Sequence, residues 1–390
     1  MQLVRDNTIR LFFAGDFCSK PPTSVISVSE ELKSIIDSCD VRFVNFEVPL
    51  KPCGVKMPAQ KRERFFQNDD APSFLKGLGF NLFSLANNHA FDWGEEGFKK
   101  TKSALGDEAF GAGTYDDAYK VKVIEVNGVK IGFLAVCFAA YTGVFDDVSR
   151  HGGLGCAYIN DLRVNHVILD AKKEVDYLFV LPHDGIEYID VPLPETIARY
   201  RDFIDYGADG VIGTHPHCPQ GWETYKGKPI FYSLGNFLFN SKEGYDYRAT
   251  NRPHWYEGLC VVMTIREGAV AWEVVNTRNV DNLEIVVDKD AARNAHNERI
   301  CHYLKERKEY EDSLIPHQNR LAQSDLRIIQ RAFEPHDVKE AMRVLLRCLR
   351  REGNSSKEEF YYLLRNDLRR SRIVFMGKQI VNKNTKCDVF

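Results

Sequence analysis

The sequence has no CxxC pair, and its ten cysteines are scattered singly along 390 residues. A chain of this length can bury a large hydrophobic core, so it does not need disulfide bonds to hold it together. Isolated cysteines are typical of a reducing compartment rather than of a secreted disulfide framework. The small disulfide-rich secreted domains are therefore excluded.

Targeting and membrane signals are also lacking. The first residues, MQLVRDNTIRLFFAGDF, do not show the charged-then-apolar pattern of a signal peptide. No run approaches the roughly 18 apolar residues of a membrane span. We therefore expect a cytoplasmic protein. The sequence also contains no internal repeat and no low-complexity tract.

A strong excess of one charge is absent, because the net charge is −3. The chain as a whole is therefore not expected to bind a polyanion. The balance is uneven, however: positions 291–390 carry 21 Lys and Arg against 14 Asp and Glu, whereas the first 290 residues carry 31 against 41. Such asymmetry suggests two regions with different partners.

Short apolar runs alternate with helical patterns over the first three quarters of the chain. The predicted strands are 9–14, 41–46, 81–85, 120–126, 129–136, 176–181, 211–213, 229–233, 258–265 and 269–275. The predicted helices are 29–38, 71–78, 95–105, 160–174 and 194–206. This alternation indicates an α/β fold with at least two sheets.

The pattern changes near residue 288, where glycine becomes nearly absent and Leu and Ile recur at helical spacing among charged residues. We predict a domain over 1–287, followed by a helical, basic region over 288–390. The helices predicted in that region are 299–312, 318–333, 337–351 and 357–370. Their basic stripes are expected either to meet an acidic lipid surface, a polyanion or a partner, or to form a solvated face.

Five predicted strands end in residues that can bind a divalent metal ion. These strand-end residues are Asp16, Glu47, Asn88, His89, His183, His215 and His217. Ligands gather at the carboxyl ends of strands in α/β sheets, so we expect these side chains to lie together. Imidazole with carboxylate suits Zn, Fe or Mn rather than Ca. The sequence thus predicts one or two such ions, with Glu47 or Asp16 bridging a pair.

A histidine that is not itself a ligand can protonate a leaving group. His89, next to Asn88, is the candidate for this role. Asp92 would either orient His89 or cap the following helix. Because a metal pair lowers the pKa of bound water to about 7, the predicted chemistry is hydrolysis.

Several of these residues stand in longer motifs that follow one another in a known order. The motifs are GDF at 15–17, NFE at 45–47, SLANNHAFDWG at 84–94, GAG at 111–113, HDGIEY at 183–188, GADGVIGTHPH at 207–217 and YSLGNFLF at 232–239. Over about residues 8–275 the chain resembles the poly-gamma-glutamate capsule synthesis protein CapA family. The resemblance implies the four-layer αββα sandwich of calcineurin-like metallophosphoesterases, with the C-terminal helices as an extension.

The resemblance also implies roles for single residues. Asp16 and Glu47 match carboxylate ligands, with Glu47 bridging. The remaining matches are Asn88, His183 and His215 as ligands of the second metal, His217 as a ligand of the first, and His89 as the general acid.

Two positions depart from the pattern. Cys18 stands where the phosphoesterases have a histidine. Its thiolate could bind Zn or Fe, or Cys18 is a small buried residue and the first metal is weakly held or absent. Asp184 stands where the family usually has Trp, and is expected to be a partner of a ligand or a substrate contact.

Three further residues are candidates for substrate binding. Arg62 and Arg64 lie in a basic, irregular loop over 48–70 that could grip an anionic substrate or be merely solvated. Asn236, in SLGNF, is expected to be a turn residue near the site that could also contact substrate.

The expected function is a metal-dependent hydrolase of a phosphoester, or of an amide or ester, in the biosynthesis of a capsule or other cell-surface polymer such as poly-gamma-glutamate or a polysaccharide. Its substrate would be an anionic small molecule or polymer, and the basic C-terminal helices would contact the membrane or capsule-synthesis proteins. The alternative is a non-catalytic binding component of a polymer synthesis or export machinery. Nucleic acid is not expected, because the first 290 residues are acidic and lack a basic, aromatic-rich channel.

Overall fold

The computed structural model describes residues 8–54, 65–138, 144–145, 153–241 and 252–314. The strands of its two main sheets are β1 (Ile9–Ser19), β2 (Ser27–Val28), β3 (Val41–Phe46), β4 (Leu82–Ser84), β5 (Ala109–Phe110), β7 (Lys122–Val126), β8 (Val129–Cys137), β11 (Tyr177–His183), β12 (Gly210–Ile212), β13 (Trp222–Tyr225), β14 (Lys228–Phe231), β15 (Asn236–Asn240), β16 (Glu257–Arg266), β17 (Ala269–Val280) and β18 (Glu284–Val287). The α-helices are α1 (Glu30–Asp37), α2 (Ala71–Gly77), α3 (Gly94–Leu105), α4 (Tyr115–Ala118), α5 (Leu162–Ala171), α6 (Pro194–Asp205) and α7 (Ala291–Tyr303).

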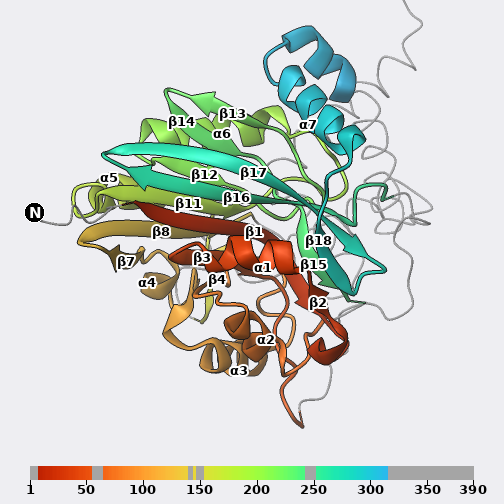
Figure 1. Cartoon of the computed structure of the whole chain (residues 1–390). Coiled ribbons are helices and arrows are strands. Elements are labelled where there is room, and N and C mark those ends of the chain that lie inside the picture. Colours follow the sequence, from red (N-terminus) through yellow and green to blue (C-terminus); the bar gives the residue numbers. More distant parts are fainter. Residues whose placement is uncertain (1–7, 55–64, 139–143, 146–152, 242–251, 315–390) are drawn as a thin grey trace, which may run out of the picture. The chain divides into compact units, whose positions relative to one another are not determined.

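The first sheet is built around β1 (Figure 1). In the described part of the chain its strands run in the order β2-β18-β17-β16-β1-β3-β4-β5, and β15 also pairs with β1. Strands β1, β3, β4 and β5 are parallel to one another, whereas β16, β17 and β18 are joined in antiparallel pairs. The carboxyl ends of β1, β3 and β4 therefore meet at one edge.

The second sheet has the order β13-β14-β12-β11-β8-β7 within the described residues. Its four inner strands are parallel, and antiparallel pairs flank them on both sides. A small third sheet joins β6 (Ala112–Gly113), β10 (Gly155–Ala157) and β9 (Val144–Phe145). The ends of β11 and β12 are thus brought side by side.

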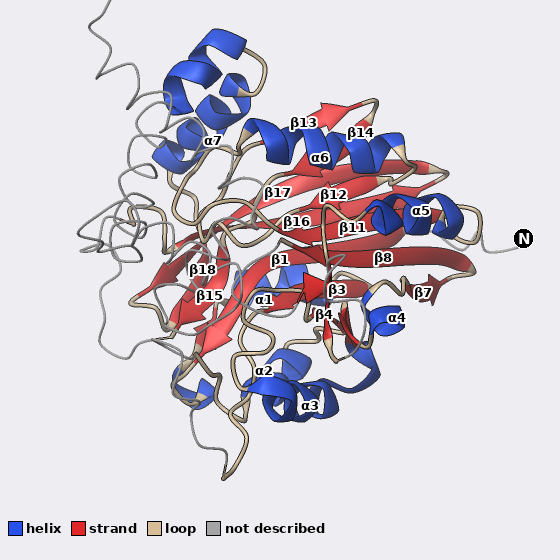
Figure 2. Cartoon of the chain, turned by 180° about the vertical axis from the view of Figure 1, so that it is seen from behind, coloured by secondary structure: helices blue, strands red, loops and turns tan. Residues whose placement is uncertain are grey.

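The two main sheets pack face to face through aromatic side chains. Phe13 of β1 contacts Phe133 and Phe179 of the second sheet, with ring centroids 6.4 and 5.8 Å apart. Its neighbour Phe12 contacts Phe80 instead, because successive side chains of a strand point to opposite faces. Helices cover the outer faces, with α1 and α2 against the first sheet and α5 and α6 beside the second (Figure 2). The predicted four-layer αββα sandwich is confirmed.

Local signals in the sequence explain several element boundaries. Ser29 caps α1 by accepting a hydrogen bond from the Leu32 backbone N–H. A two-residue turn at Asn127 and Gly128 joins β7 to β8, and both residues have positive φ, as this hairpin turn requires.

The prediction that the first strand ends at Asp16 is wrong. β1 continues to Ser19, because β15 pairs with it in parallel from Asp16 onward. The strand register shifts between Asp16 and Phe17, so Asp16 lies at an irregularity inside the strand rather than at its tip. β15 was not predicted, since its motif SLGNF was interpreted as a turn.

The C-terminal part of the described chain departs from expectation in its helix limits. α7 covers Ala291–Tyr303 rather than 299–312, residues 304–306 are not helical, and helix resumes over 307–314. α7 is joined to the sandwich by hydrogen bonds such as that from Asn297 to Asn276, 2.7 Å long. The division of the chain at residue 287 stays a prediction.

The other three helices predicted in the C-terminal region, 318–333, 337–351 and 357–370, lie outside the described residues. Among the helices that are described, none is both long enough and apolar enough to cross a bilayer.

The close approach of β1 to the segment before β15 gives a first prediction. A Cβ atom added at Gly15 would lie 1.9 Å from the carbonyl oxygen of Gly235. We expect Gly15→Ala to lower the free energy of unfolding by about 1–3 kcal/mol, since backbone must move to relieve the overlap. Urea denaturation followed by circular dichroism measures this.

Gly77, at the end of α2, is the matched control. A Cβ atom added there would have no neighbour within 4 Å. Gly77→Ala should leave the stability unchanged or raise it by up to about 1 kcal/mol. Equal unfolding midpoints for the two variants would contradict the packing described for Gly15.

Candidate metal centre

The strand ends of both main sheets bring the predicted ligands together. Asp16 comes from β1, Glu47 follows β3 and Asn88 follows β4 in the first sheet, while His183 ends β11 and the two remaining histidines follow β12 in the second. The ligand atoms of Asp16, Glu47 and His217 lie within 4.8 Å of one another, as do those of Glu47, His183 and His215. Bonds of about 2 Å to an ion place ligand atoms up to about 4 Å apart. Glu47 lies 3.6 Å from His217 in the first group and 3.7 Å from His183 in the second, so these pairs have the spacing of a metal site.

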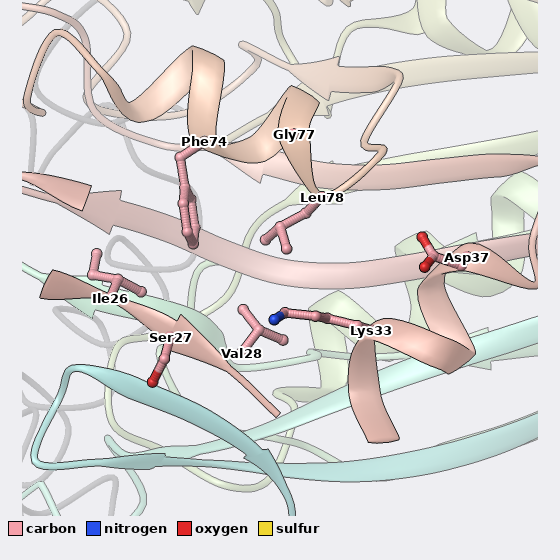
Figure 3. Close-up of a pocket in the computed structure, with 8 residues that line it drawn as sticks. All are labelled: Ile26, Ser27, Val28, Lys33, Asp37, Phe74, Gly77 and Leu78. Carbon is pink, nitrogen blue, oxygen red and sulfur yellow. The ribbon is translucent and has the colours of Figure 1, made fainter. Parts of the chain in front are cut away.

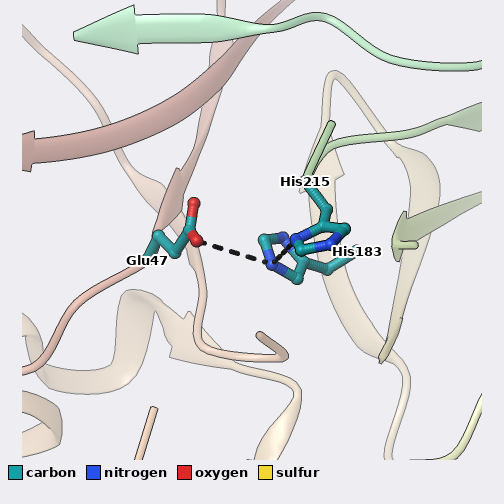
Figure 4. Close-up of side chains that lie close together, drawn as sticks. All are labelled: Glu47, His183 and His215. Carbon is teal, nitrogen blue, oxygen red and sulfur yellow. Dashed lines mark hydrogen bonds and ion pairs between the residues drawn. The ribbon is translucent and has the colours of Figure 1, made fainter. Parts of the chain in front are cut away.

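Glu47 belongs to both groups. Its Oε1 lies 3.7 Å from His183 Nε2 and 3.6 Å from His217 Nε2. Figure 4 shows Glu47 facing the paired rings of His183 and His215. Its side chain is fully buried, and neither carboxylate oxygen has a hydrogen-bond partner among the described residues. A bridging position is what the sequence predicted for this residue.

Burial, and then the charge of Asp16, raise the pKa of Glu47 well above its ordinary value. A buried carboxylate without a partner is expensive unless a cation compensates it. The donor set around Glu47 consists of carboxylates, imidazoles and an amide, which suits Zn, Fe or Mn. The residues therefore fit divalent ions on the evidence of their own chemistry and of the unpaired oxygens of Glu47.

Asp16 is held by neighbours that fix its two oxygens. Asn45 Nδ2 donates to Oδ1 over 2.6 Å, and the backbone N–H of His215 donates to Oδ2 over 3.0 Å. Burial raises the pKa of Asp16, although the charge of His217 and these two hydrogen bonds oppose the rise. The carboxylate is thus fixed in place opposite His217.

His183 is the best-connected imidazole of the centre. Its Nδ1 lies 3.1 Å from both Asn45 Nδ2 and Thr214 Oγ1. Its Nε2 lies 2.9 Å from Asn88 Oδ1 and 3.2 Å from His215 Nδ1. Burial, followed by the charges of the other histidines, lowers the pKa of His183 well below its ordinary value. It is therefore a neutral imidazole near pH 7, as a metal ligand must be.

The backbone at His215 and His217 is bent into the left-handed region, with φ of 102° and 54°. Residues other than glycine adopt such angles at a cost, and they cluster at functional sites. The bend directs both rings into the site. His217 Nδ1 lies 2.9 Å from Asn236 Oδ1, which accepts its proton and leaves Nε2 facing Glu47.

Asn236 was predicted to be a turn residue near the site. It is near the site, but it begins β15 rather than a turn. Its amide nitrogen donates to the carbonyl of Trp255 over 2.9 Å, which fixes the oxygen toward His217. The structure thus gives Asn236 a contact with a predicted ligand; a contact with substrate stays a prediction.

His89 and Asp92 form a pair at the rim of the centre. His89 Nδ1 lies 2.9 Å from Asp92 Oδ2, while His89 Nε2 lies 3.9 Å from Glu47 Oε1. The imidazole is 16% exposed, in contrast to the buried rings of His183 and His217. The N-cap residue of α3 is Trp93 rather than Asp92. Of the two predicted roles for Asp92, orienting His89 agrees with this geometry.

Cys18 lies in an apolar cluster rather than among the ligands. Its neighbours there are Val48, Phe239, Trp255 and Tyr256. Burial, and then the charge of Glu47, raise the pKa of the Cys18 thiol well above its ordinary value. Cys18 belongs to none of the ligand groups among the described residues, so the geometry favours the small buried residue of the two alternatives.

Asp184 is buried behind His183 and is absent from every ligand group found in the described residues. Its carboxylate accepts a hydrogen bond from Thr196 of α6 over 3.3 Å. Burial raises its pKa to about 6. Asp184 therefore links the end of β11 to α6 through Thr196 and is not placed as a ligand.

Glu187 was not predicted as a site residue. Its carboxylate groups with His215 and His217, with ligand atoms within 4.8 Å of one another. Burial raises its pKa, but the charges of these histidines and a hydrogen bond with Tyr188 outweigh burial and leave it below its ordinary value. The acidic residue stands in HDGIEY, four positions after His183. This carboxylate offers a further candidate ligand within reach of both histidines.

Other candidates contribute nothing to the described centre. Arg62 and Arg64 lie outside the described residues. A pocket of about 540 Å³ between β2, α1 and α2 is lined by residues such as Ile26, Lys33 and Phe74 (Figure 3). It includes none of the predicted site residues, so it is separate from the metal centre.

The buried charge of Glu47 gives a prediction for metal-free protein. Because its pKa is raised in the folded state, ionisation of Glu47 favours unfolding, and this loss of stability grows as pH rises above the ordinary value of 4.5. In chelator at pH 7, Glu47→Gln should therefore unfold at a higher urea concentration than the wild type. The gain should shrink toward pH 4.5.

Added Mn²⁺ or Zn²⁺ should reverse the order of the two proteins. The wild type gains stability by binding the ion, whereas the uncharged amide of Glu47→Gln binds it weakly. A wild type that is more stable than Glu47→Gln in chelator at pH 7 would contradict the assignment of Glu47 as the uncompensated charge.

Comparison with known proteins shows which family the chain resembles. Residues 10–241 match the family model for the bacterial capsule synthesis protein PGA_cap. The capsule biosynthesis protein CapA of Bacillus anthracis is 33% identical over 203 residues, 50% of this chain and 49% of that protein. The PGA biosynthesis protein CapA of Bacillus subtilis is 32% identical over 225 residues, 55% of this chain and 57% of that protein. The chain thus spans about half the length of these curated relatives.

Solved structures resemble the chain only loosely. A novel phosphatase of Mycoplasma pneumoniae has a TM-score of 0.44 at 16% identity, covering 69% of this chain and 93% of that one. A hypothetical protein of Thermus thermophilus has a TM-score of 0.43 at 18% identity, covering 69% and 99%. Likeness at this level carries no weight for the activity. The family model, by contrast, spans more than half of the chain, and the chain therefore belongs to the bacterial capsule synthesis protein PGA_cap family.

Proposed function

We propose that the chain is a metal-dependent hydrolase that cleaves a phosphoester, or an amide or ester, in an anionic precursor or polymer of the cell surface. The observation that carries the proposal is Glu47, a buried carboxylate with two unpaired oxygens shared by two ligand groups. Membership of a capsule synthesis family supports the substrate class.

The residues divide into two ligand sets around Glu47. Asp16 and His217 lie on one side, and Asn88, His183 and His215 lie on the other. Glu187 groups with both His215 and His217, which are histidines of different sets. Divalent ions held there would supply Lewis acidity and a water of lowered pKa. Two divalent ions would bring four positive charges against the three carboxylates of Asp16, Glu47 and Glu187, so the loaded site would keep a net positive charge for an anionic group.

His89 is the residue placed to move a proton. Asp92 Oδ2 accepts the Nδ1 proton, which fixes the ring and leaves Nε2 directed at the centre near Glu47. The ring edge also packs against Phe65, with centroids 5.1 Å apart. A proton on Nε2 can therefore be transferred to a leaving-group oxygen or nitrogen without movement of the ring.

Aromatic rings form the wall of the site and hold the imidazoles in position. Phe138 lies 4.4 Å from His215, and Trp255 lies 4.9 Å from His217, between ring centroids. Tyr188 packs against His217 and carries the guanidinium of Arg252 on its face, 4.2 Å from the ring centroid. Arg252 is a described cation close to this wall, which supports an anionic substrate.

Elemental analysis of protein purified without added metal, combined with a panel of phosphomonoesters, phosphodiesters and γ-glutamyl amides, tests the proposal. We expect bound Mn, Fe or Zn in the wild type. His183→Ala should lose metal and lower kcat/KM for any substrate found by at least about 10²-fold, since a ligand and its contacts are removed together.

His166→Ala is the matched control, because His166 is an exposed histidine on α5. It should keep both metal and activity. Metal binding without turnover of any member of the panel would contradict the hydrolase proposal and favour the non-catalytic binding component.

Replacement of His89 tests proton delivery separately from metal binding. His89→Gln should retain bound metal and lower kcat by about 10²–10⁴-fold for alkyl phosphates, whose leaving groups need a proton. Aryl phosphates with strongly acidic phenols leave without one, so their kcat should fall far less. A uniform loss across the leaving-group series would contradict the role of His89 as general acid.

A further inference from the structure

A second group of potential ligands lies outside the centre described above. It consists of Asp190 in the loop after β11, His254 just before β16, and His296 on α7. Asp190 Oδ2 lies 3.8 Å from His254 Nε2 and 3.5 Å from His296 Nε2. Three segments that are far apart in the sequence thus direct their ligand atoms to one point.

His254 is held in the orientation that a metal ligand needs. Its Nδ1 donates to Glu257 Oε2 over 2.9 Å, which leaves the lone pair of Nε2 facing Asp190. Glu257 is itself fixed by a close ion pair with Arg293 of α7. A carboxylate behind the ligating imidazole is the usual second layer of a metal site, because it sets the tautomer and strengthens the ligand.

His296 supplies an independent observation. Its side chain is 11% exposed, and its Nε2 is buried without a hydrogen-bond partner in the described part of the chain. Burial lowers its pKa to about 4, so the ring is neutral near pH 7. Within the described residues this nitrogen makes no hydrogen bond of normal length, and it faces Asp190 Oδ2 across 3.5 Å.

We propose that Asp190, His254 and His296 bind a divalent transition-metal ion of the zinc class, separate from the ions of the Glu47 centre. Two imidazoles and one carboxylate match the ligand preference of Zn²⁺ or Co²⁺ and leave a fourth position for water. Mg²⁺ and Ca²⁺ prefer sites made of oxygen ligands. The proposal does not depend on hydrolytic activity.

Binding requires one local change. His296 Nδ1 lies 2.7 Å from Arg299 Nη2, which donates to it and places the ring proton on Nε2. An ion on Nε2 moves that proton to Nδ1, so Arg299 must turn away. Arg299 is exposed, and its side chain can turn into solvent.

The proposed ion would tie α7 to the wall of the Glu47 centre. Asp190 follows Tyr188 by two positions, and His254 precedes Trp255, and both aromatic rings pack against His217. α7 is joined to β17 through Asn276 and to β13 through Cys301 (Figure 1). The ion would therefore link the C-terminal helix to the residues that surround one predicted ligand.

Metal stoichiometry of the full chain tests the proposal. The protein is stripped with chelator, reconstituted with Zn²⁺ and dialysed. We expect the wild type and the control His166→Ala to retain about one more ion per chain than His254→Ala or His296→Ala. Glu47→Gln should lose metal from its own centre while keeping this extra ion, which separates failure of one site from failure of the other.

A gain of signal guards against loss of metal through misfolding. In Co²⁺-loaded His296→Cys, a new thiolate ligand should add an intense near-ultraviolet charge-transfer band. His302→Cys, at an exposed position on the same helix, should add none. Equal ion counts in the wild type and His296→Ala, or a folded His296→Cys without the band, would overturn the proposal.

Discussion

The constraint on which the rest of the site depends is the buried carboxylate of Glu47, which lacks a hydrogen-bond donor among the described residues. Its carboxylate is fully buried and has no hydrogen-bond donor among the described residues, so these residues alone do not compensate the charge. Burial lowers the pKa of His183 and of His217, which favours the neutral imidazole that a metal ligand needs. Cations bound beside Glu47 would compensate this charge, and the candidate ligands already lie together in the folded chain.

Keeping those ligands in place requires residues that are not ligands. Asn45 contacts both Asp16 and His183, Thr214 contacts His183, and Asn236 fixes the ring of His217. These neutral amides and hydroxyls orient the charged groups without adding charge. The left-handed backbone at His215 and His217 also orients the ligands. Its conformational cost is offset by the packing of the sheets on either side.

The sequence allowed the fold and most of the centre to be predicted, and the failures have physical causes. Strand-end residues were recognised because parallel strands place their carboxyl ends at one edge, a rule that depends only on local pattern. Asp16 was placed at a strand tip because the pairing of β1 with β15 joins segments more than 200 residues apart, which no local pattern reveals. Glu187 was missed because it lies in a loop, where position in the sequence does not fix direction in space. Asn236 was recognised as near the site, although its strand was not.

The candidate ligands come from two different sheets, and this has a consequence for folding. Asp16, Glu47 and Asn88 belong to the first sheet, whereas the three histidines of the Glu47 centre, His183, His215 and His217, belong to the second. Neither sheet alone can assemble the centre, so an ion bound at Glu47 would link the two sheets across the interface that Phe13, Phe133 and Phe179 fill with apolar contacts. The free energy of metal binding would then include part of the free energy that holds the two sheets together. Any substitution that loosens the aromatic interface should weaken metal binding from a distance, without touching a ligand.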